Sequence, residues 1–140
     1  MLKLEKELLA HIKQHGEQAF PEECIGVLLG NSEGEVRNVN ALYPIENSAE
    51  FKRTEFAVSQ AELQKAEQAA ASQNLDVIGF YHSHADFEAV ASQKDRAFAI
   101  PGFSYPIVSV LGGKAAAVKS FAFIVGTKNA NFTEEEIVCL

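Results

Sequence analysis

Residues 76–95 read DVIGFYHSHADFEAVASQKD, and the first part of this stretch has the pattern of a buried β-strand. Asp76–Tyr81 is a short, mostly apolar run that is rich in β-branched and aromatic side chains. The tripeptide His82-Ser83-His84 follows directly and contains half of the four histidines of the chain. Side chains alternate between the two faces of a strand, so we expect both imidazoles on one face and Ser83 on the other. The stretch therefore predicts a strand that ends in two adjacent imidazoles.

Ser92 and Asp95 follow the tripeptide in the spacing HSH-x7-S-x2-D. Residues three apart share one face of a helix, so a helix that begins at Ser92 would bring these two side chains together. Two imidazoles and one carboxylate are the ligands of a catalytic zinc, which keeps its fourth position open for water. Taken separately, the histidines could be a polar strand edge, and Ser92-x-x-Asp95 could be a helix capping box. In a strand–loop–helix context they favour a metal site formed by His82, His84 and Asp95.

Helical and strand patterns alternate along the rest of the chain. Leucines at helical spacing predict an amphipathic helix over residues ~3–15, which Gly16 and Pro21 would end. A capping-box pattern at Ser59 predicts a second helix to about residue 73, and residues 92–100 are expected to form a short third one. Residues 44–55, which precede the second predicted helix, are a polar connection without a clear period. The expected strands are Cys24–Leu29 and Val36–Tyr43, joined in a hairpin, then Tyr105–Leu111, Ala115–Val125 and Glu135–Leu140. This order predicts a single α/β layered domain over residues 1–140.

The composition narrows the classes of function. The chain has 140 residues, a net charge of −7 and no basic cluster, which argues against a nucleic-acid binder because phosphate contacts need Lys and Arg. No apolar run reaches the ~18 residues of a membrane span, and the N-terminal residues lack a signal-sequence pattern. Cys24 and Cys139 lie in apolar runs and are expected to be buried thiols in a reducing compartment. We therefore expect a soluble cytoplasmic protein that binds neither nucleic acid nor membrane.

The motif HSH-x7-S-x2-D resembles that of the JAMM (MPN+) metallopeptidases, whose full form adds an upstream glutamate near a glycine-containing apolar strand. The stretch Pro21–Gly30, PEECIGVLLG, is similar, with Glu23 three residues before Gly26. Glu22 and Glu23 cannot both face the site, and the spacing favours Glu23. Ala85 replaces the proline that usually follows the second histidine, which is expected to loosen the loop without removing a ligand. The resemblance covers nearly the whole chain and implies a three-layer domain with a central mixed β-sheet flanked by helices, of the cytidine-deaminase-like kind.

The resemblance also implies a role for each residue of the motif. His82, His84 and Asp95 would bind zinc together with one water, whose pKa the metal lowers toward ~7. Glu23 would be the general base that takes a proton from this water and returns it to the departing amine. Ser92 would help to stabilise the oxyanion that develops on the attacked carbonyl. The chain is therefore expected to be a zinc metallopeptidase of the JAMM type.

The compactness of the chain bears on its substrate. Eukaryotic members of the family carry insertions that recognise ubiquitin chains, and no large insertion follows His84 or Ser92 here. The chain is more similar to compact bacterial and archaeal members linked to sulfur-carrier proteins of ubiquitin fold. This resemblance implies hydrolysis of an amide or isopeptide bond at the C-terminal tail of such a ubiquitin-like protein. The oligomeric state is left open, a homodimer included.

Several alternatives compete with this interpretation. His82-x-His84-x-Asp86 also resembles the start of the metallo-β-lactamase motif, but no histidine follows His84, so Asp86 is expected to be a polar loop residue. His11 and His15 stand four apart on the first predicted helix, lack a zincin glutamate, and are expected at its surface or edge. An MPN-type scaffold would have no need of the ligand set. A metal-dependent hydrolase of a non-peptide substrate would need it, and stays open as an alternative.

Overall fold

The computed structural model describes residues 1–92, 95, 99–125 and 130–140, which form one sheet and two helices. The helices are α1 (Lys6–Ala19) and α2 (Gln60–Ser72). The strands are β1 (Leu2–Leu4), β2 (Ile25–Glu33), β3 (Val36–Ile45), β4 (Asp76–Ala85), β5 (Ser104–Leu111), β6 (Lys114–Val125), β7 (Ala130–Glu135) and β8 (Ile137–Cys139). Within the described ranges, neither helix is long and apolar enough to cross a membrane.

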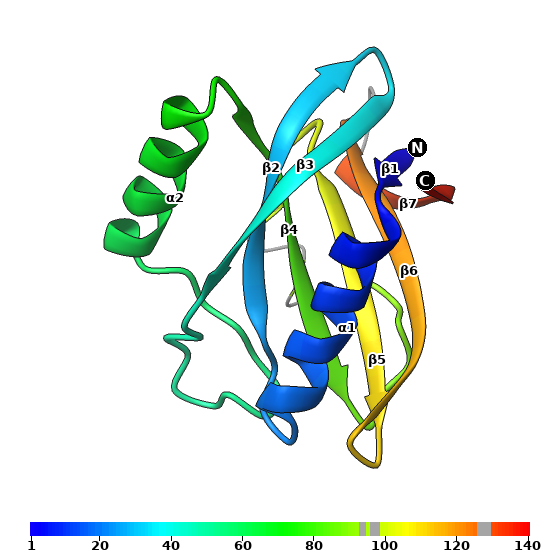
Figure 1. Ribbon diagram of the computed structural model, residues 1–140. Coiled ribbons are helices and arrows are strands. Elements are labelled where there is room, and N and C mark those ends of the chain that lie inside the picture. The colour runs from blue at the N-terminus through cyan, green and yellow to red at the C-terminus, as the bar shows by residue number, and fades with distance from the viewer. Residues whose placement is uncertain (93–94, 96–98, 126–129) are drawn as a thin grey trace.

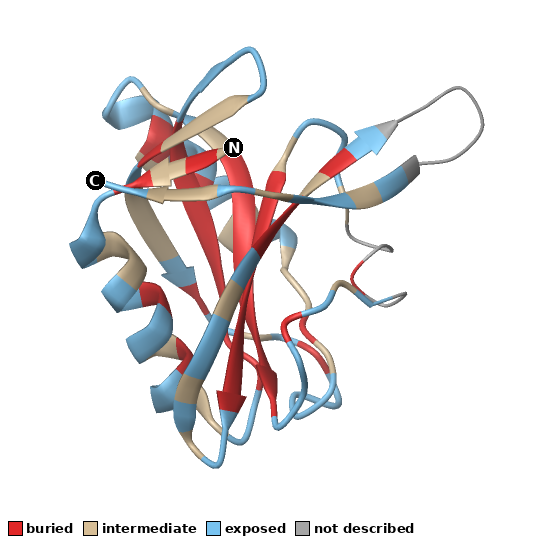
Figure 2. Cartoon of the chain, turned by 90° about the vertical axis from the view of Figure 1, so that its right-hand side faces the viewer, coloured by how far each residue is buried: buried red, intermediate tan, exposed pale blue. Residues whose placement is uncertain are grey.

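The strands form a mixed sheet in the order β7-β6-β5-β4-β2-β3-β1-β8, with parallel pairs at β4–β5, β1–β3 and β1–β8. An apolar cluster around Ile12 and Tyr81 lies under α1, and a second cluster with Ala66 and Phe80 lies under α2. Because Phe80 and Tyr81 are neighbours on β4, the two clusters occupy opposite faces of the sheet. Figure 1 shows α1 across the front of the sheet and α2 beyond β2, and Figure 2 shows the buried residues concentrated on the central strands. The predicted three-layer α/β fold with a central mixed sheet is confirmed.

Strand β4 carries the histidines and lies in the interior of the sheet. The predicted strand is confirmed and continues through the tripeptide to Ala85. His82 is paired with Ile25 of the antiparallel neighbour β2 and with Ile107 of the parallel neighbour β5. Hydrogen-bonded strands on both sides therefore fix the backbone of the tripeptide.

The N-terminal segment differs from the sequence prediction at both ends. Leu2–Leu4 form β1, and α1 begins only at Lys6. The helix continues past Gly16 to Ala19, so the prediction that Gly16 ends it was wrong. A Cβ at Gly16 would lie 2.9 Å from Val108 Cγ1, so the absence of a side chain lets α1 pack closely on β5.

The C-terminal segment also differs from the prediction. Glu135–Leu140 was expected to be one strand, but the chain forms β7 and β8 at opposite edges of the sheet. Cys139 is exposed, so the expectation that it is a buried thiol was wrong, whereas Cys24 is buried as predicted. The reason is that β8 is an edge strand with only β1 beside it, a position that apolar composition does not reveal.

Two other local predictions are confirmed, whereas residues 44–45 of the expected connection belong to β3, and residues 92, 99 and 100 of the expected third helix are not helical. Ser59 Oγ accepts a hydrogen bond from the Glu62 N–H at 3.2 Å, so the capping box of α2 is confirmed. The predicted hairpin is formed by β2 and β3. The helix predicted for residues 92–100 includes 93–94 and 96–98, which lie outside the described residues.

We expect Gly26→Ala to destabilise the fold by about 1–3 kcal/mol, the usual cost of overpacking a core. A Cβ on Gly26 would lie 2.1 Å from Cζ of Tyr81, whose ring is fully buried and cannot move aside freely. The free energy of unfolding, measured by chemical denaturation, checks this prediction. Ser32→Ala at the exposed end of the same strand is the control and should change stability by less than ~0.5 kcal/mol. A Gly26→Ala protein as stable as this control would contradict the packing described here.

Candidate metal centre

His82 and His84 project from β4 toward the face that α2 covers, and both are buried. His82 packs against Phe56, a residue of the cluster under α2, with ring centroids 4.5 Å apart. The Nε2 atoms of the two histidines are 3.1 Å apart. Ser83 points to the opposite face, where its Cβ lies near Gly16 of α1. The predicted alternation of side chains is therefore confirmed, and it brings both imidazoles to one place.

Asp95 approaches the same place from outside the sheet. Its Oδ1 lies 3.1 Å from His82 Nε2, and its Oδ2 lies 3.5 Å from His84 Nε2. Asp95 Oδ2 also accepts the Ser92 N–H at 2.8 Å, while Ser92 Oγ accepts the Asp95 N–H at 3.2 Å. The capping pattern and the contact with the histidines therefore occur in the same two residues. The Ser92 hydroxyl acts as an acceptor in this pair, which leaves its proton for another partner.

Glu23 stands two residues before the start of β2 and is the candidate glutamate that is grouped with both histidines. Glu23 is only 6% exposed, whereas Glu22 is exposed. A carboxylate oxygen of Glu23 and one ring nitrogen each of His82 and His84 all lie within 4.8 Å of one another. Two carboxylates, those of Glu23 and Asp95, therefore accompany the imidazole pair.

The ring of His84 is oriented by a hydrogen bond on its outer side. His84 Nδ1 lies 2.8 Å from the main-chain carbonyl oxygen of Glu88. A carbonyl oxygen can only accept, so Nδ1 carries a proton and Nε2 is the ring nitrogen that faces His82 and Asp95. Metal-binding histidines almost always have such a partner on the other ring nitrogen, because it fixes the tautomer and the ring orientation.

The turn after β4 is anchored to β5 by hydrogen bonds. Asp86 Oδ1 accepts the Gly112 N–H at 2.8 Å, and Ser109 Oγ donates to the Phe87 carbonyl at 2.5 Å. Asp86 has a φ of 61°, a left-handed conformation that Asp tolerates better than most residues. Asp86 and Ser109 therefore anchor the loop that follows Ala85.

The ring of His82 is held by packing rather than by an outer hydrogen bond. Its Nδ1 is buried and has no hydrogen-bond partner among the described residues. Its contacts with His84 and Asp95 are all made by Nε2. Burial lowers the pKa of His82, and this outweighs the opposing effect of Asp95. His82 is therefore a neutral imidazole near pH 7.

Hydrogen bonds and nearby charges together reverse the effect of burial on the other two groups. Burial lowers the pKa of His84, but hydrogen bonds to Asp95 and to the Glu88 carbonyl, with the charges of Asp95 and Glu23, raise the pKa overall. Burial raises the pKa of Asp95, but hydrogen bonds from His82, His84 and the Ser92 N–H, with the charge of His82, hold the pKa well below its usual value. Asp95 is therefore an ionised carboxylate, the form in which it can bind a cation.

These donor atoms fit a zinc ion. Bonds of ~2.0–2.1 Å at tetrahedral angles separate two zinc ligands by about 3.3 Å. The separations among His82 Nε2, His84 Nε2 and the Asp95 oxygens are 3.1, 3.1 and 3.5 Å. Two imidazole Nε2 atoms and a carboxylate that meet at one place need protons or a cation between them. Two nitrogen ligands and one oxygen ligand also match a catalytic zinc with an open fourth position.

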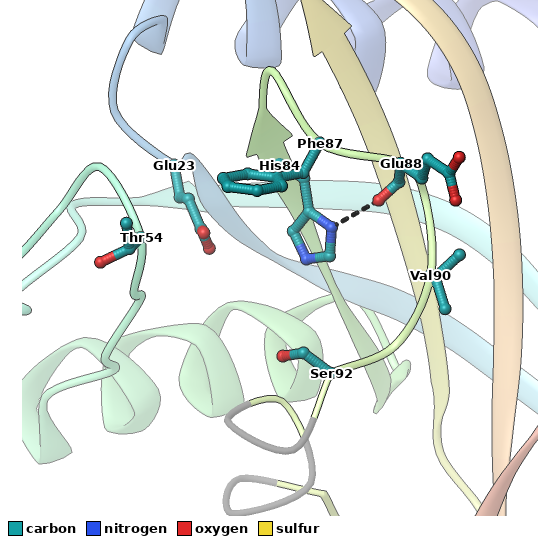
Figure 3. A pocket seen from close by; sticks show the side chains of 7 residues that line it. All are labelled: Glu23, Thr54, His84, Phe87, Glu88, Val90 and Ser92. Atoms are coloured by element: carbon teal, nitrogen blue, oxygen red, sulfur yellow. Dashed lines mark hydrogen bonds between the residues drawn. The ribbon is translucent and has the colours of Figure 1, made fainter.

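A cavity of 670 Å³ opens beside these residues. Figure 3 shows Thr54 on one side, Val90 on the other, and Glu23 and His84 between them. The rim is apolar and accessible, since Phe87 is 62% exposed and Val90 is 50% exposed. Among the described residues, those that line the cavity are Glu23, Thr54, His84, Phe87, Glu88, Val90 and Ser92. A cavity of this size is typical of ligand and substrate sites.

Comparison with known proteins assigns the chain to a family. Residues 5–124 match the family of prokaryotic homologs of the JAB domain. The chain belongs to the prokaryotic JAB-domain family. A desampylase from Haloferax volcanii is 34% identical to this JAB-domain chain over 110 residues, which are 78% of each protein.

Solved structures agree with the JAB-domain assignment. Protein DSY2949 from Desulfitobacterium hafniense has a TM-score of 0.85 at 30% identity, with coverage of 100% of this chain and 93% of the other. A protein from Salinibacter ruber has a TM-score of 0.75 at 35% identity, with coverage of 100% and 92%. AF2198, a JAB1/MPN domain protein from Archaeoglobus fulgidus, shares the fold with a TM-score of 0.58 at 19% identity, with coverage of 99% and 94%. The resemblance to the JAMM (MPN+) family that the sequence motif indicated is confirmed.

Two other groups of candidate residues in this JAB-domain chain lie apart from the centre. His11 is exposed, and His15 Nδ1 lies 2.8 Å from the hydroxyl of Tyr81 under α1. Among the described residues, the only cluster of three or more His, Cys, Asp or Glu side chains with metal-binding spacing is the one with Glu23, His82 and His84. Burial raises the pKa of the Cys24 thiol to about 12, so this thiol is not a nucleophile at neutral pH.

The sequence pattern did not indicate one wall of the cavity. Thr54 belongs to the polar connection between β3 and α2, which has no period that predicts a structure. Asn47, in the same connection, donates a hydrogen bond to the Glu23 carbonyl at 3.0 Å. An Asn-Ser pair is a common turn signal, but nothing in the sequence relates it to Glu23.

Proposed function

We propose that this JAB-domain chain is a zinc-dependent isopeptidase that hydrolyses the amide bond at the C-terminal tail of a ubiquitin-like protein of the sulfur-carrier type. The observation that carries the proposal is the convergence of His82, His84 and Asp95, with Glu23 beside them, at an open cavity. Relationship to a desampylase supports a JAB-type hydrolase that acts on ubiquitin-like protein conjugates.

In this proposal His82, His84 and Asp95 hold the zinc ion. Zinc bound there lowers the pKa of water toward ~7 and withdraws electrons from a carbonyl group. Glu23 takes a proton from the attacking water and delivers it to the departing nitrogen, so that the C–N bond breaks after the C–O bond has formed. The Ser92 hydroxyl donates a hydrogen bond to the carbonyl oxygen as that oxygen gains negative charge.

The cavity also supports a tail as the substrate. Glycine residues have no side chain, so a Gly-Gly tail can bring its carbonyl close to the buried centre. Phe87 and Val90 offer exposed apolar surface to the residues that precede the glycines. Both lie on the loop that anchors His84, which places the proposed tail contacts next to the ligands.

The function is tested with a ubiquitin-fold sulfur-carrier protein whose terminal glycine is joined to the Nε of a lysine in a second protein. We expect the purified chain to release both proteins, with the carrier tail ending in a free glycine carboxylate and the products together heavier by one water. Mass spectrometry of the products reads this out. The reaction should stop with a chelator and resume when zinc is added.

Two outcomes would contradict the proposal in different ways. Zinc binding without release of this conjugate or of a linear C-terminal extension would favour a hydrolase of a non-peptide substrate. Failure to bind zinc, together with formation of a stable complex with a partner, would favour a scaffold of the MPN type.

A further inference from the structure

The side chain of Asn47 is the centre of a hydrogen-bond network beside the proposed general base. Its Nδ2 donates to the Glu23 carbonyl at 3.0 Å and to the Glu55 carbonyl at 2.7 Å. Its Oδ1 accepts the N–H of Ala49 at 3.0 Å and the N–H of Ala57 at 3.1 Å. A carboxamide has two N–H donors and one oxygen that accepts two hydrogen bonds, so the capacity of Asn47 is fully used. Only one orientation of the carboxamide satisfies two carbonyls and two N–H groups.

Glu23 precedes β2, which begins at Ile25, and its peptide groups are held by contacts with the connection between β3 and α2. Its N–H donates to the carbonyl of Lys52 at 2.7 Å, and its carbonyl accepts from Asn47. The next N–H, that of Cys24, donates to Ser83 Oγ at 2.7 Å. Lys52 and Asn47, both in the connection between β3 and α2, thus each hold one peptide group of Glu23.

The same connection forms a wall of the cavity. Thr54 lies on this wall, opposite Val90 (Figure 3). It directly precedes Glu55, whose carbonyl is the second acceptor of the Asn47 amide. Asn47 therefore joins the backbone of Glu23 to the wall that a substrate would touch.

We infer that Asn47 is a positioning residue that holds the Glu23 carboxylate beside His82 and His84. This inference rests on the proposed function, in which Glu23 exchanges protons with water and with the departing amine. A general base has to lie within hydrogen-bond reach of the proton that it takes. A displacement of about 1 Å can reduce a rate by about 100-fold. The Asn47 amide holds the carbonyl of Glu23 from the connection between β3 and α2, so its loss is expected to displace Glu23.

The variant Asn47→Asp tests the inference because it keeps the shape and the acceptor oxygen but replaces the donor with an oxygen. That oxygen would face the carbonyls of Glu23 and Glu55, and the two contacts would become repulsive. We expect kcat for tail release to fall about 10- to 100-fold, with KM within about 3-fold of wild type and the metal content unchanged. The matched control is Asn40→Asp on the exposed hairpin, which adds the same charge and should keep the wild-type rate.

A merely structural role of Asn47 would give a different pattern. The melting temperature and the folded fraction would fall, and KM would rise with the displaced Thr54 wall, while kcat per folded, metal-loaded molecule would stay at the wild-type value. That pattern, or a kcat within 2-fold of wild type, would overturn the inference. If wild type itself releases no tail, the proposed function fails instead.

A measurement on the wild-type protein keeps the inference testable if Asn47→Asp does not fold. The carboxamide protons of Asn47 should exchange with solvent much more slowly than those of Asn40, as NMR of the amide groups would show. Equal exchange rates would mean that the network is not formed, and the inference would then be wrong. This readout does not depend on activity, so it also separates the inference from the proposed function.

Discussion

Glu23→Gln is expected to lower kcat for tail release by about 10²–10⁴-fold, the usual contribution of a general base. Glutamine has the size of glutamate but cannot take a proton from water at neutral pH. Glu23 is 6% exposed and lies within 4.8 Å of the ring nitrogens of both histidines, so no other group easily replaces it. The rate of carrier release, measured in single turnovers, checks the prediction. Glu22→Gln, at the exposed neighbouring position, is the matched control and should keep the wild-type rate.

The metal content of the same variants separates the two carboxylates of the site. We expect Glu23→Gln to retain one zinc ion per chain and Asp95→Asn to lose it, because Asp95 contacts the Nε2 atoms of both histidines. The reverse result would mean that Glu23 is the third ligand. An active Glu23→Gln protein with full metal content would show that another group is the base.

Removal of zinc is expected to abolish activity and to reduce stability. In the proposed function zinc would bind only the folded arrangement of His82, His84 and Asp95, so its binding energy would add to the free energy of unfolding. At a free zinc concentration about 1,000 times the dissociation constant, this stabilisation is about 4 kcal/mol. Activity and thermal unfolding, with and without a chelator, check the prediction.

His84→Ala tests whether the effects of zinc arise at this centre. The variant should be inactive, and added zinc should no longer raise its melting temperature. His11→Ala is the control, because His11 is an exposed imidazole on α1 and should leave both zinc effects unchanged. A zinc-dependent rise in melting temperature that persists in His84→Ala would place the metal elsewhere.

The sequence predicted the parts of the molecule that depend on local pattern. Alternation along one strand predicted that His82 and His84 share a face, and the structure puts their Nε2 atoms 3.1 Å apart. The spacing to Gly26 favoured Glu23, and the ring of Tyr81 now explains why a glycine stands there. The capping pattern of Ser92 and Asp95 is present as well, although the helix expected from it includes residues outside the described ranges.

What the sequence did not predict depends on contacts between distant segments. Leucines at helical spacing included Leu4, but Leu2–Leu4 pair with β3 and β8 at the edge of the sheet. Glycine is typical of a helix end, yet Gly16 lies within α1, where the absence of a side chain allows close packing on Val108. Asn47 belongs to no helical or strand pattern in the sequence. It is related to Glu23 by a hydrogen bond between the polar connection and the residues that precede β2. Period and propensity carry no information on such pairings.

The most direct test of the account is a crystal structure of wild-type protein, purified without chelators, with anomalous diffraction data collected on both sides of the zinc edge. We predict one anomalous peak per chain, about 2.0–2.2 Å from His82 Nε2, His84 Nε2 and one Asp95 oxygen, with Glu23 outside the coordination sphere. A fully zinc-equilibrated crystal without this peak, or with Glu23 in place of Asp95 as the third ligand, would contradict it.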